Sequence, residues 1–188
     1  MKWLLALALS AVLQPSISLQ DIDGVRRMPL KVEAGGKATA LFFVTHDCPV
    51  SNYYSHEIRR ICDDYGKRGV SCSLVYVDPT LTSDQVRKHA ADYGHGDYPK
   101  IVDRRHELVA ATGAEITPTA VIIRPDESIA YRGRIDNFYA DFGKPRREVT
   151  RHDLRDALDA VLAGKPVANA ENKPVGCYIP ELKFYGVK

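Results

Sequence analysis

The sequence lacks a Cys-x-x-Cys pair, and its four cysteines (Cys48, Cys62, Cys72 and Cys177) are widely spaced. The usual short motif of an internal redox dithiol is therefore absent. An excess of charge is also absent, because 26 basic residues nearly balance 24 acidic ones for a net charge of +2. This balance gives no electrostatic reason to expect binding to nucleic acid or to a membrane surface. With 45% hydrophobic residues in 188, the composition suits one globular domain.

Long hydrophobic runs are missing beyond the N-terminus. There, Lys2 precedes the apolar residues 3–13, which lead to the small-residue triplet 16–18. A basic start, a short apolar core and small residues are typical of a secretory signal peptide, and the run is too short for a membrane span. We therefore predict a signal peptide over residues 1–18, export to the periplasm or the extracellular space, and one domain over residues 19–188 that ends in an irregular tail. An uncleaved N-terminal anchor is the alternative.

Cys48 has the most chemically informative position in the chain. It follows the apolar run 40–44, which predicts a buried strand, and Pro49 after it is typical of the first turn of a helix. The unpaired N–H groups and the dipole of a helix start favour the thiolate form of such a cysteine. The thiolate is the reactive species in disulfide exchange, peroxide reduction and soft-metal binding. Ser51, in the first helical turn, is expected to donate a hydrogen bond to it.

Hydrophobic periodicity predicts a strand–helix alternation followed by a hairpin and a last helix. We expect strands over residues 37–45, 70–78, 100–102, 119–124 and 129–132, and helices over residues 50–67, 82–93, 106–112 and 152–163. Residues 133–149 and the tail from residue 165 are predicted to be irregular. Arg132, Arg134, Asp136 and Asn137 are expected in a solvated loop, and the alternative is that they shape a partner-docking surface or the rim of the site. The aromatic residues 138, 139 and 142 are expected to pack this loop on the body. The order predicts an α/β fold with a mixed sheet.

This order, with a cysteine directly after the first core strand, resembles the thioredoxin fold, a three-layer α/β/α sandwich. Residues 113–121 resemble the cis-proline loop of that superfamily, so Thr117 and Pro118 are expected to face Cys48. The stretches Thr-His-Asp-Cys-Pro-Val-Ser-Asn and Val-Gly-Cys-Tyr-Ile resemble exported bacterial redoxins, which are grouped with the peroxiredoxin-like AhpC/TSA proteins. The resemblance covers most of the chain and implies that Cys177 is a regular feature of the group.

The resemblance implies an exported thiol–disulfide redox protein. In that mechanism the Cys48 thiolate attacks a substrate disulfide, and Cys177 or an external thiol resolves the mixed disulfide. Ser51 supports the thiolate, and Thr117 and Pro118 shape the substrate groove. The expected partners are protein thiols and disulfides, or a small-molecule thiol or peroxide, and no organic cofactor is expected. Cys177 has an alternative role, as half of a disulfide that anchors the tail.

Two departures from the family patterns keep other functions open. Ser51 stands where thioredoxins have their second cysteine. Thr45 and Cys48 match the Thr-x-x-Cys part of the peroxiredoxin motif, but Leu41 replaces its proline. A thiol peroxidase is therefore one alternative, and its supporting arginine would be one of Arg124, Arg132 and Arg134.

A non-enzymatic binding protein is the other alternative. Cys48, Cys177 and His46 offer the sulfur and imidazole ligands that copper(I) or zinc prefers. A thioredoxin-fold scaffold without turnover belongs to the same class. Cys62 and Cys72 are expected to form a structural disulfide or to remain two buried thiols, because one lies on the first helix and the other on the next strand.

Overall fold

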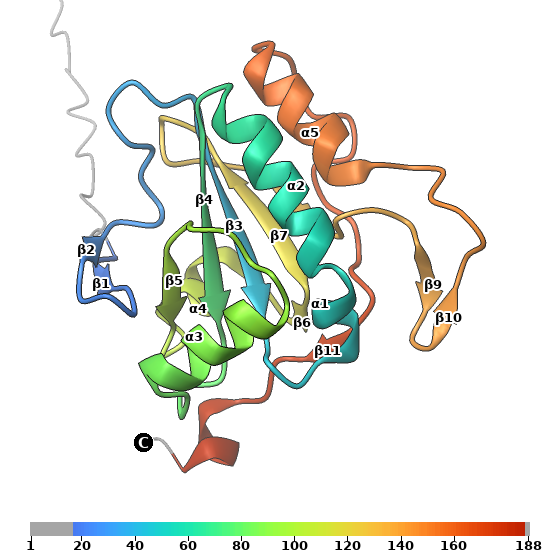
Figure 1. Ribbon diagram of the computed structural model, residues 1–188. Coiled ribbons are helices and arrows are strands. Elements are labelled where there is room, and N and C mark those ends of the chain that lie inside the picture. The colour runs from blue at the N-terminus through green and yellow to red at the C-terminus, as the bar shows by residue number, and fades with distance from the viewer. Residues whose placement is uncertain (1–16, 187–188) are drawn as a thin grey trace, which may run out of the picture.

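The computed structural model describes residues 17–186, so residues 1–16 of the predicted signal peptide lie outside the described part. A five-stranded sheet forms its centre (Figure 1), and it contains β3 (Ala38–Val44), β4 (Val70–Tyr76), β5 (Lys100–Val102), β7 (Thr119–Ile123) and β8 (Ile129–Gly133). The strand order is β5-β4-β3-β7-β8, with β3, β4 and β5 parallel and β7 and β8 antiparallel to their neighbours. The predicted mixed sheet is confirmed.

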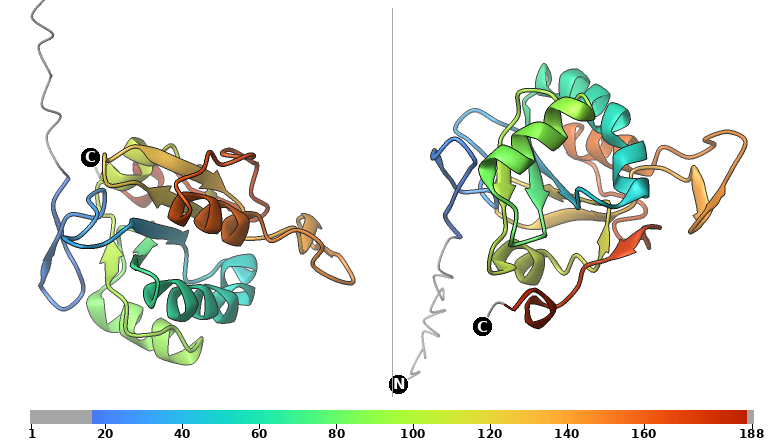
Figure 2. Two further views of the ribbon diagram at one scale, coloured as in Figure 1. Left: turned by 90° about the horizontal axis from the view of Figure 1, so that it is seen from above. Right: turned by 60° about the horizontal axis from the view of Figure 1, so that its bottom comes forward.

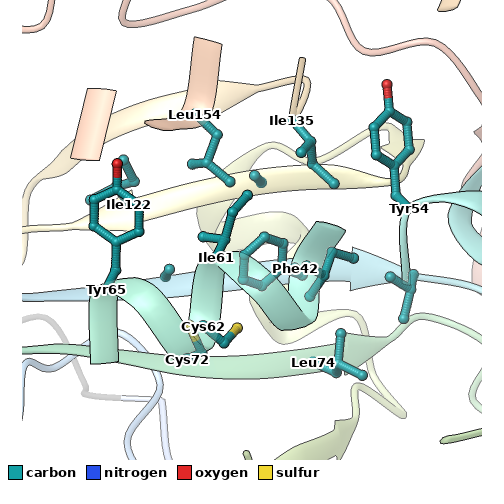
Figure 3. Close-up of a cluster of buried hydrophobic side chains, with 14 of the residues drawn as sticks. Phe42, Tyr54, Ile61, Cys62, Tyr65, Cys72, Leu74, Ile122, Ile135 and Leu154 are labelled. Carbon is teal, nitrogen blue, oxygen red and sulfur yellow. The ribbon is translucent and has the colours of Figure 1, made fainter. Parts of the chain in front are cut away.

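Helices cover both faces of this sheet and give three layers. The front face in Figure 1 is covered by α2 (Ser55–Gly66), α3 (Ser83–Asp92) and α5 (Asp153–Leu162), and α4 (Glu107–Thr112) lies behind. Every residue of β3 is buried, and its side chains alternate between two apolar clusters. Phe42 packs with Ile61 and Leu154 in the front cluster (Figure 3), whereas Leu41 packs with Leu108 of α4 on the other face. This two-sided burial explains why the strand is a continuous apolar run.

The helix predicted over residues 50–67 is divided in two. A short α1 (Pro49–Tyr53) ends at Tyr54, and α2 begins at Ser55. The Ser55 hydroxyl donates a hydrogen bond of 2.8 Å to the carbonyl of Asn52, and the Tyr54 hydroxyl donates one of 2.5 Å to Asp136. Serine and tyrosine side chains that bond near the break therefore mark a boundary that apolar periodicity does not reveal.

Two regions predicted to be irregular contain short strands. Residues 133–149 include the hairpin β9 (Tyr139–Asp141) and β10 (Lys144–Pro145), which extends away from the body in Figures 1 and 2. The tail contains β11 (Cys177–Tyr178) and a 3₁₀ helix over Leu182–Tyr185. At the N-terminus, β1 (Leu19–Gln20) pairs with β2 (Arg26–Arg27). All of these strands are two or three residues long, so their sequences are too short to show a period.

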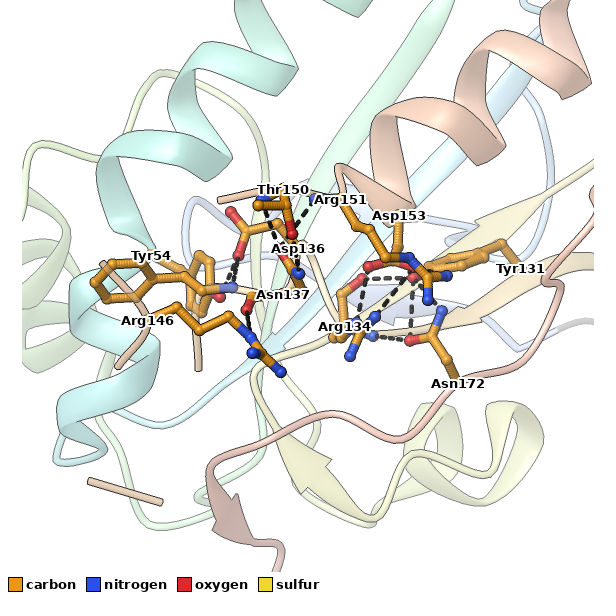
Figure 4. Close-up of polar contacts among 11 residues, drawn as sticks. Tyr54, Tyr131, Arg134, Asp136, Asn137, Arg146, Thr150, Arg151, Asp153 and Asn172 are labelled. Carbon is orange, nitrogen blue, oxygen red and sulfur yellow. Dashed lines mark hydrogen bonds and ion pairs between the residues drawn. The ribbon is translucent and has the colours of Figure 1, made fainter. Parts of the chain in front are cut away.

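The solvated loop predicted around residue 136 is wrong. Asp136 and Asn137 are 7% and 5% exposed, and both serve as hydrogen-bond centres (Figure 4). Asp136 accepts from the Tyr54 hydroxyl and from the Phe138 N–H, while Asn137 accepts from the N–H groups of Thr150 and Arg151. These bonds tie the base of the hairpin to the body and satisfy groups that burial would otherwise leave unpaired.

Cys62 and Cys72 are free thiols, the second of the two predicted alternatives. Both are 7% exposed, and their side chains meet between α2 and β4 (Figure 3). Burial and the hydrogen bond with Cys72 raise the pKa of the Cys62 thiol far above its usual range. Within residues 17–186, no helix has the length and apolar character needed to cross a membrane.

The buried Asp103 carboxylate caps the N-terminus of α4, and its removal should reduce the stability of the protein. Its carboxylate is 0% exposed and accepts hydrogen bonds of 2.8–2.9 Å from the N–H groups of Glu107, Leu108 and Val109. Asp103→Ala leaves those donors unsatisfied, so we expect it to lower the free energy of unfolding by about 2 kcal/mol or more. Urea denaturation measures this change. Asp97→Ala, at an exposed loop carboxylate, is the control and should change the free energy by less than about 0.5 kcal/mol.

Candidate active site

Cys48 lies at the junction of β3 and α1, as predicted. It is the residue that precedes the first helical turn, with Pro49 at the helix start. Its sulfur accepts a hydrogen bond of 3.5 Å from the Ser51 N–H, and its thiol donates one of 3.4 Å to the carbonyl of Thr117. The side chain is only 1% exposed. The helix start therefore supplies a donor to the sulfur, while the surrounding chain keeps solvent away from it.

The tail brings Cys177 to this buried sulfur. Strand β11 pairs antiparallel with β6 (Ile116–Thr117), and Cys177 stands opposite Thr117 in the register. Figure 1 shows β11 beside β6 and close to α1. The Thr117–Pro118 peptide bond is cis, as the resemblance to the cis-proline loop of the thioredoxin superfamily implies. The structure thus gathers four of the five predicted catalytic residues around Cys48, which is the fifth.

Gly176 allows the tail to approach the cis-proline loop closely. A Cβ atom at this position would lie 1.9 Å from the Thr117 oxygen and 2.9 Å from its carbonyl carbon. The contact is with the backbone, so no side chain can rotate away to make room. Any residue larger than glycine here must move the tail, and the neighbouring Cys177 with it.

Opposing influences act on the ionisation of Cys48. Burial by itself would raise the pKa of this thiol, but hydrogen bonds from the Cys177 thiol and from the Ser51 N–H bring it below its usual value. Donors to a sulfur stabilise its negative charge, whereas desolvation destabilises it. The net result favours a thiolate at Cys48, the state that attacks disulfides and peroxides.

The pKa of the Cys177 thiol is shifted in the opposite direction. Burial and the hydrogen bond that it donates to Cys48 raise its pKa to about 12. Its side chain is half-buried, so it is more accessible than Cys48. One thiol of the pair is therefore ionised first and buried, and the other holds its proton and is partly exposed.

The other predicted residues contribute unequally. Ser51 acts on the sulfur through its backbone N–H; its hydroxyl lies near Cys48, yet it has no hydrogen-bond partner among the described residues. The Thr117 hydroxyl is 3.2 Å from that of Thr45, and it donates a hydrogen bond of 3.4 Å to the carbonyl of Cys177. Thr117 therefore contacts both cysteines, one through its carbonyl and the other through its hydroxyl.

His46 stands apart from the two thiols. Its Nδ1 atom is 3.8 Å from the Asp78 carboxylate, and its carbonyl accepts from the Asn52 amide. Among residues 17–186, no group of three or more histidine, cysteine or acidic side chains is arranged to hold a metal ion. The predicted set of Cys48, Cys177 and His46 is thus not assembled here, and only the two sulfurs face each other. Copper or zinc binding stays a prediction.

The candidate arginines for a peroxidase have other partners. Arg134 forms an ion pair of 2.7 Å with the buried Asp153. Arg132 bonds to the carbonyl of Thr112 and to Glu171. Arg124, at the end of β7, precedes the turn to β8 and donates its N–H to the carbonyl of Ser128. None of the three hydrogen-bonds to Cys48 among the contacts of the described chain.

An aromatic cluster beside Cys48 is absent from the predictions. Tyr53 of α1 stacks on Phe138 with ring centroids 4.5 Å apart, and Tyr139 meets Phe138 edge-on at 5.1 Å. Tyr53 is 47% exposed, so the cluster borders the surface. Burial raises the pKa of Tyr139, and the charge of Cys48 raises it further, which places this phenol near the thiol. The sequence signal was the aromatic content of residues 138–142.

The mixed sheet, the cis-proline loop and the helix-start cysteine define a thioredoxin-like redoxin. The AhpC/TSA family model matches residues 13–132, and the chain belongs to that family. A comparison with curated proteins found no match.

Solved structures agree with this fold. The chain is similar to an uncharacterized conserved protein from Geobacillus kaustophilus, with 30% identity, coverage of 89% of both chains and a TM-score of 0.73. A hypothetical protein from Sinorhizobium meliloti 1021 shares 26% identity over 87% of this chain and 89% of its own, with a TM-score of 0.72. A secreted Mycobacterium tuberculosis disulfide oxidoreductase shares the fold at 14% identity, over 79% of this chain and 96% of its own, with a TM-score of 0.53.

The Cys177 thiol is expected to control the ionisation of Cys48. Cys177→Ala removes a donor to the Cys48 sulfur while burial remains, so the pKa of Cys48 should rise. Thiolate absorbance followed against pH, with the Cys48→Ser signal subtracted, should show the titration at higher pH than in the unmodified protein. Cys177→Ser keeps a donor and should restore most of the depression. An unchanged titration in Cys177→Ala would contradict this assignment.

The contact of Gly176 with Thr117 leads to a second prediction about this site. Gly176→Ala should displace β11, because overpacking of this kind costs about 1–3 kcal/mol, which corresponds to a rise in the open population of about fivefold to 150-fold. Cys48 should then react faster with iodoacetamide at a pH above the usual cysteine value, where it is ionised in both proteins. Gly66→Ala, with no atom within 4 Å of the added Cβ, is the matched control. Equal alkylation rates in all three proteins would refute the close packing.

Proposed function

We propose that this protein is an exported thiol–disulfide oxidoreductase in which Cys48 and Cys177 cycle between two thiols and one disulfide. One observation carries the proposal: β11 sets Cys177 opposite Thr117, whose carbonyl accepts a hydrogen bond of 3.4 Å from the Cys48 thiol, so the two cysteines lie together. Family membership supports thiol redox chemistry in general. Export is proposed from the signal-like residues 1–18 and from the stability of disulfides outside the cytosol.

In the reducing direction, the Cys48 thiolate attacks one sulfur of a substrate disulfide. A bond forms between that sulfur and Cys48, the substrate S–S bond breaks, and the first substrate thiolate leaves with the electron pair. That thiolate takes the proton of Cys177. The Cys177 sulfur then attacks Cys48, and the second substrate thiolate is released. The substrate has gained two electrons, and the protein holds a Cys48–Cys177 disulfide.

The two sulfurs differ as targets when this disulfide is reduced. Cys48 is 1% exposed and Cys177 is half-buried, so an external thiolate reaches Cys177 more easily. Cys48 is also the better leaving group, because its pKa is the lower of the two. Access and leaving-group quality therefore both favour attack on Cys177, with Cys48 leaving as a thiolate.

A thiol peroxidase is the second candidate, and the burial of Cys48 favours it over reaction with a large substrate. A peroxide is small enough to need little opening of the tail. The Cys48 thiolate would attack one peroxide oxygen, become a sulfenic acid and release the other oxygen as water or an alcohol. Attack of Cys177 on the sulfenic acid would then form the same disulfide and release water.

Trapping experiments on single-cysteine variants test the proposal. Treated with glutathione disulfide, Cys177→Ser should accumulate a mixed disulfide on Cys48, whereas the unmodified protein should form the Cys48–Cys177 bond. Peptide mass spectrometry identifies both products. Hydrogen peroxide in place of glutathione disulfide tests the peroxidase through the rate of peroxide consumption and a sulfenic acid on Cys48.

Cys62→Ala with Cys72→Ala provides the control, because these thiols lie in the core away from the site. This variant should form the Cys48–Cys177 disulfide as the unmodified protein does. Failure of the unmodified protein to form that bond with any of these oxidants would refute the proposed cycle.

A further inference from the structure

Asn172 fastens the tail to the sheet five residues before Cys177. Its side-chain oxygen accepts a hydrogen bond of 2.9 Å from the Arg134 N–H, and its amide donates one of 3.1 Å to the Tyr131 hydroxyl (Figure 4). Its main-chain N–H donates a hydrogen bond of 3.2 Å to the carbonyl of Arg132. Tyr131 is 1% exposed, so these bonds are anchored in the core. No other role in the fold requires an amide side chain at this position.

Gly133 of β8 makes room for this contact. A Cβ atom at Gly133 would lie 2.4 Å from the side-chain oxygen of Asn172 and 2.8 Å from its main-chain oxygen. Gly133 does not have a positive φ, so an alanine suits the backbone conformation here. The glycine is needed because Asn172 comes close. A substitution at Gly133 therefore disturbs the same contact without changing Asn172 itself.

A second anchor follows Cys177. The Ile179 N–H donates a hydrogen bond of 2.9 Å to the carbonyl of Glu115, and the Ile179 side chain packs on the apolar cluster beneath α4. Residues 172–179, here named the tail strap, are therefore fixed at both ends. Cys177 lies between the two anchors, which restrict its movement away from Cys48.

We propose that Asn172 is a positioning residue for Cys177, which fixes the tail strap so that the resolving thiol stays at the Cys48 sulfur. This inference rests on the proposed cycle of Cys48 and Cys177. It adds a residue that touches neither sulfur and that no redox motif marks. Its effect is on the effective concentration of one thiol at the other.

The size of the effect follows from the length of the tether. With the Asn172 anchor, Cys177 is held from residue 172. Without it, the next firm anchor is Ala170, whose carbonyl accepts a hydrogen bond of 2.8 Å from the Arg132 N–H, so the tether becomes about 1.4 times as long. Effective concentration falls roughly as the −3/2 power of tether length, so the loss is about 1.7-fold. The Ile179 anchor is common to both cases.

The redox equilibrium with glutathione measures this quantity directly. Two protein thiols and one glutathione disulfide exchange to give the Cys48–Cys177 disulfide and two glutathione thiols, so the equilibrium constant reports the effective concentration. Asn172→Ala should lower this constant about 1.7-fold, and Gly133→Ala should lower it to a similar extent. The double variant should lower it no further, because both changes break one contact. Asn172→Asp keeps the acceptor for Arg134 and should recover most of the loss.

Asn137→Ala is the matched control. Asn137 is buried, whereas Asn172 is half-buried, and it accepts from two main-chain N–H groups, but it holds residues 150–151 instead of the tail. It should reduce thermal stability as Asn172→Ala does and leave the equilibrium constant unchanged. An Asn172→Ala constant equal to that of the unmodified protein, or equal losses in Asn137→Ala, would overturn the positioning role.

A second readout separates this inference from the proposed function. The titration of Cys48 needs no turnover, and it should move to higher pH in Asn172→Ala, as in Cys177→Ala. If the unmodified protein forms no Cys48–Cys177 disulfide, the proposed cycle fails. The positioning role is then decided by the titration, where a shift supports it and an unchanged curve overturns it.

Discussion

The pairing of β11 with β6 is the contact on which the arrangement of the thiols depends. It sets Cys177 opposite Thr117, whose carbonyl accepts a hydrogen bond from the Cys48 thiol. Side chains alternate along a strand, so a slip of one residue would turn the Cys177 side chain to the opposite face of β11 and bring its neighbour into its place. Gly176 permits this register because only a hydrogen fits against the Thr117 carbonyl. A main-chain contact thus determines the chemistry of a side-chain pair.

Membership of the AhpC/TSA family describes the scaffold more completely than the chemistry. Leu41, at the position of the peroxiredoxin proline, is fully buried in the cluster beneath α4 and lies outside the group that surrounds Cys48. Arg134 is held by Asp153, so it balances a buried carboxylate instead of the thiolate. The Cys48 charge is met by neutral donors, Ser51 N–H and the Cys177 thiol. The ionisation of Cys48 therefore depends in part on the tail, because the tail supplies the Cys177 donor.

The sheet and the position of Cys48 follow from local patterns in the sequence, whereas the geometry of the tail does not. The apolar run of β3 and the helix start after Cys48 each depend on a few neighbouring residues, so their sequences are sufficient to predict them. The cis Thr117–Pro118 bond follows from the resemblance to the thioredoxin fold. The strand β11 is two residues long and forms only because β6 is there to pair with it. Asn172 is likewise an ordinary polar residue until Tyr131, Arg134 and Gly133 converge on it. The hairpin base at Asp136 differs from the predicted solvated loop for the same reason. The partners that bury this carboxylate, such as Tyr54, are distant in the sequence.

The four cysteines form two pairs, which differ in the pKa shifts of their thiols. Cys48 and Cys177 share a lowered and a raised pKa, so one thiolate is available to start an exchange. Cys62 and Cys72 lie together in the core, where the raised pKa of Cys62 keeps its sulfur protonated and burial keeps reagents away. A thiol without thiolate character exchanges slowly. In a redox titration, each chain should therefore behave as a two-electron carrier, and the second pair should act as a silent store of reducing equivalents that becomes countable only when the core is unfolded.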